Sequence, residues 1–214
     1  MSFTHAHCNE RDFRDNRSHF RSYEMILRYS LALTTLFCSA SALACQTPDN
    51  LVPNCGFLTN ANGWEIETGT CARDANSGAS GTGNLTCSSF AGMFSHIVRF
   101  RRCLLAANGV SGGKVYSYSA FSQRVSGSNV ICNLELADFT SDNCANNVNA
   151  ATTPLVFGTP PSYLASVPAT YTVAANTVSA SIRVDCTSQA AFQIRVDDVH
   201  VGVQDPIFKS GFET

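Results

Sequence analysis

The chain has 214 residues, of which 44% are hydrophobic and 14% are charged, and its formal net charge is −2. This length and hydrophobic content suit one domain with its own core and argue against two domains. So few charged residues provide no basic face that would bind a nucleic acid.

A secretory signal is predicted at residues 25–44. Arg28 supplies its positive start, residues 31–37 form its apolar core, and Ala42-Leu43-Ala44 provides a small-x-small cleavage site. No other stretch approaches the roughly 18 apolar residues that a membrane span requires. We therefore expect a secreted protein, extracellular or periplasmic, whose mature chain begins at Cys45.

Residues 1–24 are polar, have no apolar period, and are interpreted as an over-extended translation start with Met25 as the initiator. A disordered extension is the alternative interpretation. Residues 45–203 form the expected domain. Residues 204–214 are expected to be a frayed tail, although their Ile-Phe-x-x-Gly-Phe-Glu pattern resembles the ends of some secreted bacterial proteins.

Eight of the ten cysteines follow the cleavage site, and an even number in an exported chain predicts disulfide bonds. They are Cys45, Cys55, Cys71, Cys87, Cys103, Cys132, Cys144 and Cys186. Acylation of Cys45, as in a lipoprotein, would leave one of the other seven unpaired, so ordinary secretion is favoured. Zinc is disfavoured because the chain has no Cys-x-x-Cys pair.

The connectivity of eight cysteines does not follow from sequence alone. Spacing nevertheless favours two local bonds, Cys71 with Cys87 and Cys132 with Cys144. Cys45 with Cys55 and Cys103 with Cys186 then follow by elimination, and each bond is expected to stabilise the fold by about 2–4 kcal/mol.

Alternation with a period of two runs through the domain, and no window has the three-and-four spacing of a helix. In residues 114–125 it places Tyr116, Tyr118 and Ala120 on one face and Ser117, Ser119, Phe121 and Gln123 on the other. In residues 96–102 and 129–139 it turns inward Val98, Phe100, Cys132, Leu134 and Leu136, and it turns outward Ile97, Arg99, Arg101, Asn133 and Glu135. Further strands are predicted at residues 169–173, 178–185 and 191–203.

About eight or nine short strands with polar turns predict an all-β protein, an antiparallel two-sheet β-sandwich stapled by disulfides. A jelly roll is preferred over the immunoglobulin topology because Trp64 lies too early to sit between paired strand cysteines. Leu51 and Val52 are expected to open the first strand. Residues 143–166, which contain three prolines, are expected to be the longest loop.

Three segments resemble the carbohydrate-binding modules of families four and nine and their galactose-binding-like relatives. The opening segment matches at Asn50, Leu51, Asn54, Phe57, Gly63 and Trp64. The strand Gly113-Lys114-Val115-Tyr116 and the closing Asp197-Asp198-Val199 step are also similar to the family. The sequence departs from the family pattern at Cys55, where glycine is usual, and at Leu58, where an acidic residue is usual.

The resemblance implies a structural calcium ion, with Asp197 and Asp198 as candidate ligands. Calcium prefers six to eight oxygen ligands, and Leu58 removes one of them. The site is therefore expected either to be absent or to use backbone carbonyls. The alternative is that one aspartate pairs with Arg195 or with a turn N–H. No other cofactor is expected.

The resemblance also implies a non-catalytic module that binds a glycan. Stacking on a sugar needs an outward aromatic ring beside polar groups, and the candidate residues are Phe121, Gln123, Asn133, Glu135 and Arg195. The alternative is that Phe121 covers the sandwich edge beneath residues 143–166. A structural or adhesive sandwich that contacts another protein is the second hypothesis for the function.

A small serine hydrolase is the least favoured hypothesis. Ser111 lies in a Gly-x-Ser-x-Gly pattern, but a β-alternating run follows it where a nucleophile elbow requires a helix. His96 and His200 are the histidines of the mature chain, and both fall on predicted strands. Glu65 and Glu67 lie two apart on one strand face without the partners of a glycosidase. We therefore expect no enzymatic activity.

Overall fold

The computed structural model describes residue 45 and residues 47–80, 83–92 and 94–204. The predicted translation start at residues 1–24, the predicted signal at residues 25–44 and all of the predicted tail after Gln204 lie outside this part of the chain. The described residues cover the expected domain at residues 45–203 apart from residues 46, 81, 82 and 93.

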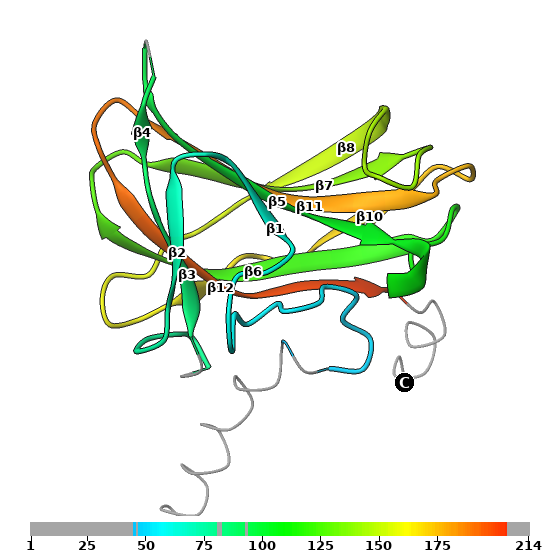
Figure 1. Cartoon of the computed structure of the whole chain (residues 1–214), viewed down its shortest axis with the longest axis horizontal. Coiled ribbons are helices and arrows are strands. Elements are labelled where there is room, and N and C mark those ends of the chain that lie inside the picture. The colour runs from blue at the N-terminus through cyan, green and yellow to red at the C-terminus, as the bar shows by residue number, and fades with distance from the viewer. Residues whose placement is uncertain (1–44, 46, 81–82, 93, 205–214) are drawn as a thin grey trace, which may run out of the picture. The chain divides into compact units, whose positions relative to one another are not determined.

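Two antiparallel sheets face each other across a common core (Figure 1). Sheet A has the order β1 (Trp64–Thr68), β5 (His96–Leu105), β11 (Ser179–Ser188), β7 (Ile131–Phe139) and β8 (Asn147–Pro154), with β4 (Phe90–Ala91) beside β5. Sheet B has the order β10 (Ala169–Thr172), β6 (Val115–Ser126), β12 (Gln193–Val203), β3 (Asn84–Ser88) and β2 (Thr70–Asp74), with β9 (Leu164–Ala165) beside β6. The predicted all-β sandwich is confirmed, with the short 3-10 turn η2 (Ala106–Asn108) between β5 and β6.

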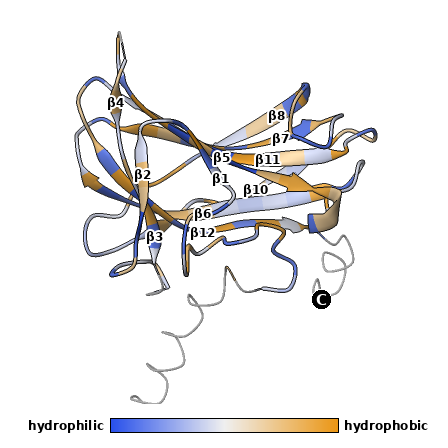
Figure 2. Cartoon of the chain, viewed as in Figure 1, coloured by the Kyte–Doolittle hydropathy of each residue, from blue (hydrophilic) through white to orange (hydrophobic). Residues whose placement is uncertain are grey.

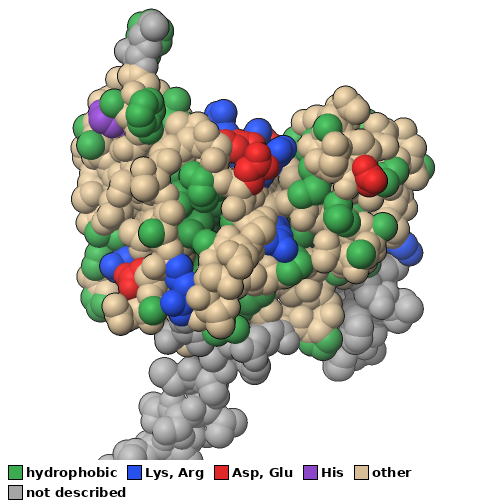
Figure 3. All heavy atoms as spheres, in the orientation of Figure 1, with side chains coloured by type: hydrophobic (Ala, Val, Ile, Leu, Met, Phe, Trp, Pro, Cys, Tyr) green, Lys and Arg blue, Asp and Glu red, His purple; other side chains and the backbone are tan. Residues whose placement is uncertain are grey.

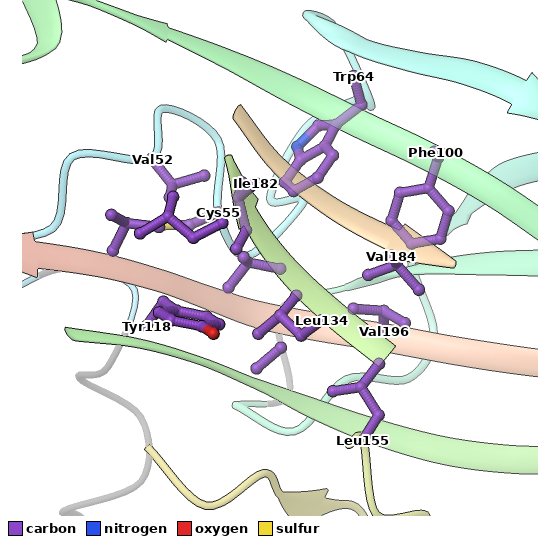
Figure 4. Packing of buried hydrophobic residues seen from close by; sticks show 14 of the residues in the cluster. Val52, Cys55, Trp64, Phe100, Tyr118, Leu134, Leu155, Ile182, Val184 and Val196 are labelled. Carbon is purple, nitrogen blue, oxygen red and sulfur yellow. The ribbon is translucent and has the colours of Figure 1, made fainter. Parts of the chain in front are cut away.

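The inward residues of the two sheets form one core, as the alternation predicts. Figure 2 shows hydrophobic and hydrophilic residues mixed along the strands, and Figure 4 shows Leu134, Val184 and Val196 pointing into the space between the sheets. Tyr116 and Tyr118 are each 1% exposed, so their predicted inward orientation is confirmed.

Trp64 begins β1 and is a core residue. Its ring centroid lies 5.3 Å from that of Phe57 and 5.7 Å from that of Phe100. The expected strand at Leu51 and Val52 is wrong, because these residues lie in a loop. The loop is held to β12 mainly through Asn50, whose side chain bonds to the backbone of that strand, and the N–H of Leu51 donates to the Val201 carbonyl at 2.7 Å.

All eight cysteines of the expected domain form disulfide bonds, two of them with the predicted partners. Cys45 pairs with Cys55, and Cys71 pairs with Cys87. The other two predicted pairs are wrong, since the bonds observed are Cys103–Cys144 and Cys132–Cys186.

The strand order explains this exchange of partners. Strand β11 lies between β5 and β7, which places Cys186 directly opposite Cys132 on the core face. Cys103 lies on the outer face of β5, because it alternates with the buried Leu104. It therefore meets Cys144, which follows β7, and cannot reach Cys186 through the sheet.

The prediction that residues 143–166 form the longest loop is wrong. This segment contains β8, which pairs with β7 along its whole length, and the short β9, which pairs with β6. Most side chains of β8 are exposed, so the strand lacks the apolar alternation by which it could have been found. With these additions the described residues contain twelve strands, more than the eight or nine expected.

A buried carboxylate, that of Asp138 on β7, joins the two sheets at one end of the sandwich. It accepts hydrogen bonds from the Asn149 N–H at 2.9 Å, the Tyr171 hydroxyl at 2.9 Å, the Ala174 N–H at 2.8 Å and the Thr177 hydroxyl at 3.0 Å. Asn149 belongs to sheet A and Tyr171 to sheet B. Although burial alone would raise the pKa of Asp138, these four hydrogen bonds lower it below its usual value.

We expect Asp138→Asn to destabilise the protein by about 2–4 kcal/mol at pH 7, because the ionised acceptor of several buried donors is lost. A carboxyl with a lowered pKa contributes stability above its unfolded-state pKa and loses that contribution as the pH falls. The difference from the wild type, measured by urea unfolding, should therefore shrink toward pH 3. Asp142→Asn, at an exposed position nearby, is the control, and an equal loss in both variants would contradict the role of Asp138.

Candidate functional site

The outer face of sheet A carries charged side chains in two rows that cross the strands. In the first row Glu65 on β1 lies opposite Arg101 on β5, Arg101 opposite Arg183 on β11, and Arg183 opposite Glu135 on β7. In the second row Arg99 on β5 lies opposite Asp185 on β11, and Asp185 lies opposite Asn133 on β7. We call these residues, together with Glu67, the charged rows.

Ion pairs fix the charged rows in place. Arg101 Nε lies 2.9 Å from Glu65 Oε2 and 3.1 Å from Glu67 Oε1. Arg99 donates twice to Asp185 Oδ2, from Nη2 at 2.7 Å and from Nε at 3.0 Å.

The pairing continues across β11 and β7, where Arg183 Nη2 lies 2.8 Å from Glu135 Oε1. Two atoms, Arg183 Nε and Asp185 Oδ1, have no hydrogen-bond partner among the described residues. Both atoms are buried, so it is the partly exposed remainder of the Arg99, Arg101 and Arg183 side chains that faces solvent.

An apolar row borders the charged rows on the same face. Phe90 on β4 lies opposite Ile97 on β5, which lies opposite Thr187 on β11, and Thr187 lies opposite Ile131 on β7. Phe90 is 64% exposed and Ile131 is 67% exposed, and Phe94 in the adjacent turn is 83% exposed. Such large exposed side chains next to charged groups mark a candidate binding surface.

Figure 3 shows acidic and basic side chains gathered in a hollow of the upper surface, and the protein surface protrudes on both sides of this hollow. In the orientation of Figure 1 this hollow lies over the middle of sheet A, above β1, β5 and β11. The charged rows therefore occupy a concave part of the surface. We treat this face, the charged rows and the apolar row together, as the candidate functional site.

The structure does not bring the five predicted sugar-binding residues together. Asn133 and Glu135 lie on sheet A, in the charged rows, whereas Phe121, Gln123 and Arg195 lie on sheet B. They are thus divided between the two sheets and form no single site. A sugar contact by any one of them stays a prediction.

Gln123 is buried and its side chain is already engaged. Its Nε2 donates to the Ser162 carbonyl at 3.0 Å, and its Oε1 accepts from Arg195 Nη1 at 3.0 Å. Phe121 is half-buried and lies opposite Ala165 of β9. The segment of residues 143–166 therefore runs beside Phe121, as the alternative interpretation of that ring expects.

Asp197 and Asp198, the candidate calcium ligands, lie at a β-bulge where β12 has one extra residue relative to β6. Both are buried, and Asp198 has a positive φ of 45°. Asp197 accepts hydrogen bonds from the Ala79 N–H at 2.7 Å and from the Asp198 N–H at 2.8 Å. This is the pairing with a turn N–H that was the expected alternative to calcium.

The pKa values of both aspartates are raised, as expected for two neighbouring carboxyl groups that are buried. Burial, together with the charge of Asp198, raises the pKa of Asp197 to about 7. Burial raises the pKa of Asp198 to about 6, and its Oδ2 has no hydrogen-bond partner among the described residues. Below these pKa values a proton neutralises each group.

A raised pKa means that the protonated form fits the fold better, so the pair costs stability as the pH rises from about 4 toward 7. Asparagine cannot ionise. We therefore expect Asp198→Asn to gain stability relative to the wild type as the pH rises, with the largest gain near pH 8, as measured by urea unfolding. A variant that becomes less stable than the wild type toward pH 8 would show that the ionised carboxylate has a cationic partner.

The hydrolase pattern around Ser111 lacks the context of a nucleophile elbow. Ser111 lies between η2 and β6, so a strand follows it and not a helix. Its N–H donates to the Tyr116 hydroxyl at 2.8 Å, which makes it part of a turn. His96 on β5 and His200 on β12 contact Ser89 and Asp49 respectively.

No protein-family model matches the sequence, and no curated protein is detectably similar to it. Solved structures nevertheless share the fold. The structure described as Family 16 Carbohydrate Binding Module-2 has a TM-score of 0.55 and 11% identity, with 71% of this chain and 99% of that chain covered. The module TmCBM61, in complex with beta-1,4-galactotriose, has a TM-score of 0.50 and 14% identity, with 72% and 99% covered.

The enzymatically active domain of Bacteriophage CBA120 tailspike protein 4 has a TM-score of 0.55 and 13% identity, over 72% of this chain. The chain spans only 21% of the length of that protein. At these identities the similarity shows the fold alone, a β-sandwich of the kind found in carbohydrate-binding modules. The particular resemblance to families four and nine is not confirmed.

Sequence reasoning missed how the charged rows assemble. Arg183 and Asp185 were not among the predicted site residues. Their spacing of two positions puts both on one face of a strand, and the same spacing relates Arg99 to Arg101 and Asn133 to Glu135. These three pairs of outward polar residues could have indicated a polar outer face on each of the three strands. What the sequence lacks is the information that β11 lies between β5 and β7, which brings the pairs side by side.

Proposed function

We propose that this protein is a secreted, non-catalytic carbohydrate-binding protein that binds a glycan on the outer face of sheet A. The observation that carries the proposal is the apolar row lying directly beside the charged rows, which occupy a concave part of the surface. Together they offer both kinds of contact that a sugar ring uses.

A sugar ring has an apolar C–H face and an edge of hydroxyl groups. Phe90 and Ile131 provide exposed apolar surface on which the C–H face can pack. Arg99, Arg183 and Asp185 provide charged donors and acceptors, and hydrogen bonds to charged groups are stronger than neutral ones.

The shape of the face supports a ligand that is extended across the strands. Both kinds of row cross β5, β11 and β7. The first charged row and the apolar row each run over four strands, which at a spacing of about 4.8 Å span roughly 14 Å, enough for a short oligosaccharide or a stretch of a polysaccharide. The known structures with this fold agree with the proposal, since two of them are described as carbohydrate-binding modules and one of these contains a galactotriose.

Four disulfide bonds suggest an extracellular protein, because such bonds persist in oxidising compartments. Within the part of the chain that the structure describes, no helix has the length and apolar character needed to cross a membrane. Secretion, guided by the predicted signal at residues 25–44, completes the proposal.

We expect Phe90→Ala and Asp185→Asn each to weaken retention on a bound polysaccharide by about tenfold or more. The reason is that an aromatic contact or a charged hydrogen bond contributes about 1–3 kcal/mol, and 1.4 kcal/mol is a factor of ten. The measurement is affinity electrophoresis against a panel of soluble plant and microbial polysaccharides, with melting temperatures recorded for every variant.

Phe121→Ala is the matched control, because it removes the same type of side chain from sheet B and should leave retention unchanged. If Phe121→Ala abolishes retention while Phe90→Ala does not, the binding face is the one first predicted from the sequence. If the wild type is retained by no polysaccharide in the panel, the hypothesis of a protein-contacting sandwich is favoured.

A further inference from the structure

A single guanidinium holds the loop that leads into β1. Arg73 on β2 donates from Nε to the Phe57 carbonyl at 2.5 Å and from Nη2 to the Leu58 carbonyl. Phe57 is fully buried and has a positive φ of 49°. The loop conformation there is thus one that a non-glycine residue adopts only when its surroundings hold it.

The buried aspartates of β12 lie in the same region as this loop, and two glycines, Gly78 and Gly83, pack closely against the aspartates and the loop. A Cβ atom on Gly83 would lie 2.9 Å from the Phe57 carbonyl oxygen and 3.3 Å from Arg73 Nη2. A Cβ atom on Gly78 would lie 2.9 Å from Asp197 Oδ2. These close approaches leave little room between the loop, β2 and the bulge of β12.

The oxygen atoms of this corner do not fit the calcium ion that the family resemblance implies. Leu58 has an apolar side chain that is 43% exposed, and the Phe57 and Leu58 carbonyls already accept from Arg73. Both oxygens of Asp197 accept from backbone N–H groups, and Asp198 Oδ2 is the one carboxylate oxygen of the pair that has no hydrogen-bond partner among the described residues. Among the described residues no three histidine, cysteine or acidic side chains are grouped so that they could hold a metal, whereas calcium takes six to eight oxygen ligands.

We infer that the guanidinium of Arg73 replaces a metal ion as the cation that fixes this loop, so that the fold does not depend on divalent cations. A guanidinium is always charged and directs several donors in a rigid plane, which suits two neighbouring carbonyls. The two hydrogen bonds from Arg73 also affect the candidate site. The loop that they hold ends at Trp64, and the residues that follow place Glu65 and Glu67 in the charged rows. Arg73 is therefore a positioning residue for the edge of that face.

The test is the melting temperature of the purified protein with EDTA and with millimolar calcium chloride. The inference predicts the same melting temperature for the wild type in both, and a wild type that melts lower in EDTA and recovers with calcium overturns it. This readout needs no glycan, so its outcome is independent of whether the proposed function is correct.

Substitution provides the second measurement. Arg73→Met removes the charge but keeps much of the side-chain length, and we expect its melting temperature to fall by about 5–10 °C, since two hydrogen bonds from a charged group are lost. Arg73→Lys, which keeps the charge, should recover part of the loss. Arg124→Met on β6 of the same sheet is the control. An Arg73→Met variant as stable as Arg124→Met overturns the inference, and if it fails to fold, the response of the wild type to EDTA decides alone.

Discussion

The central strands of sheet A, β5, β11 and β7, each turn every second side chain into the core, and the rest of the structure depends on this alternation. Because Phe100, Val184 and Leu134 must all be buried, the register between the strands has little freedom to slip. The residues that alternate with them then lie on the outer face, directly opposite one another on neighbouring strands. The hydrophobic core and the charged rows are in this sense two results of the same constraint.

The charged rows are better understood as an oriented surface than as a source of stability. Ion pairs at partly exposed positions contribute little to folding, and the members of these rows are partly exposed, with Arg99 at 37% and Arg183 at 29% side-chain exposure. What the pairing provides is a set of donors and acceptors held in fixed directions, so that a ligand need not order them on binding. The neighbouring Phe90 and Ile131 add apolar surface that the core does not require. Stability depends instead on buried groups such as Asp138, which ties sheet A to sheet B, and on the four disulfide bonds.

Local patterns predicted the sandwich and the inward residues of its long strands, because period-two burial can be read one strand at a time. The sequence could not reveal which strands are neighbours. That order decides both the exchanged disulfide partners of Cys103 and Cys132 and the assembly of the charged rows. Strand β8 was missed because its side chains are mostly exposed and polar, and the loop at Leu51 was taken for a strand because two apolar residues in sequence do not distinguish the two. Phe121 was correctly placed opposite the inward tyrosines, but its predicted partners Asn133 and Glu135 belong to the other sheet.

The most direct test of the binding face is nuclear magnetic resonance of the arginine side chains during titration with an oligosaccharide that binds. The Nε–H groups of Arg99, Arg101 and Arg183 lie in the charged rows, whereas those of Arg73 and Arg195 lie on sheet B. We predict that the first three signals shift with saturating ligand while the other two stay in place. Shifts confined to Arg195 and its neighbours on sheet B would contradict a binding face on sheet A.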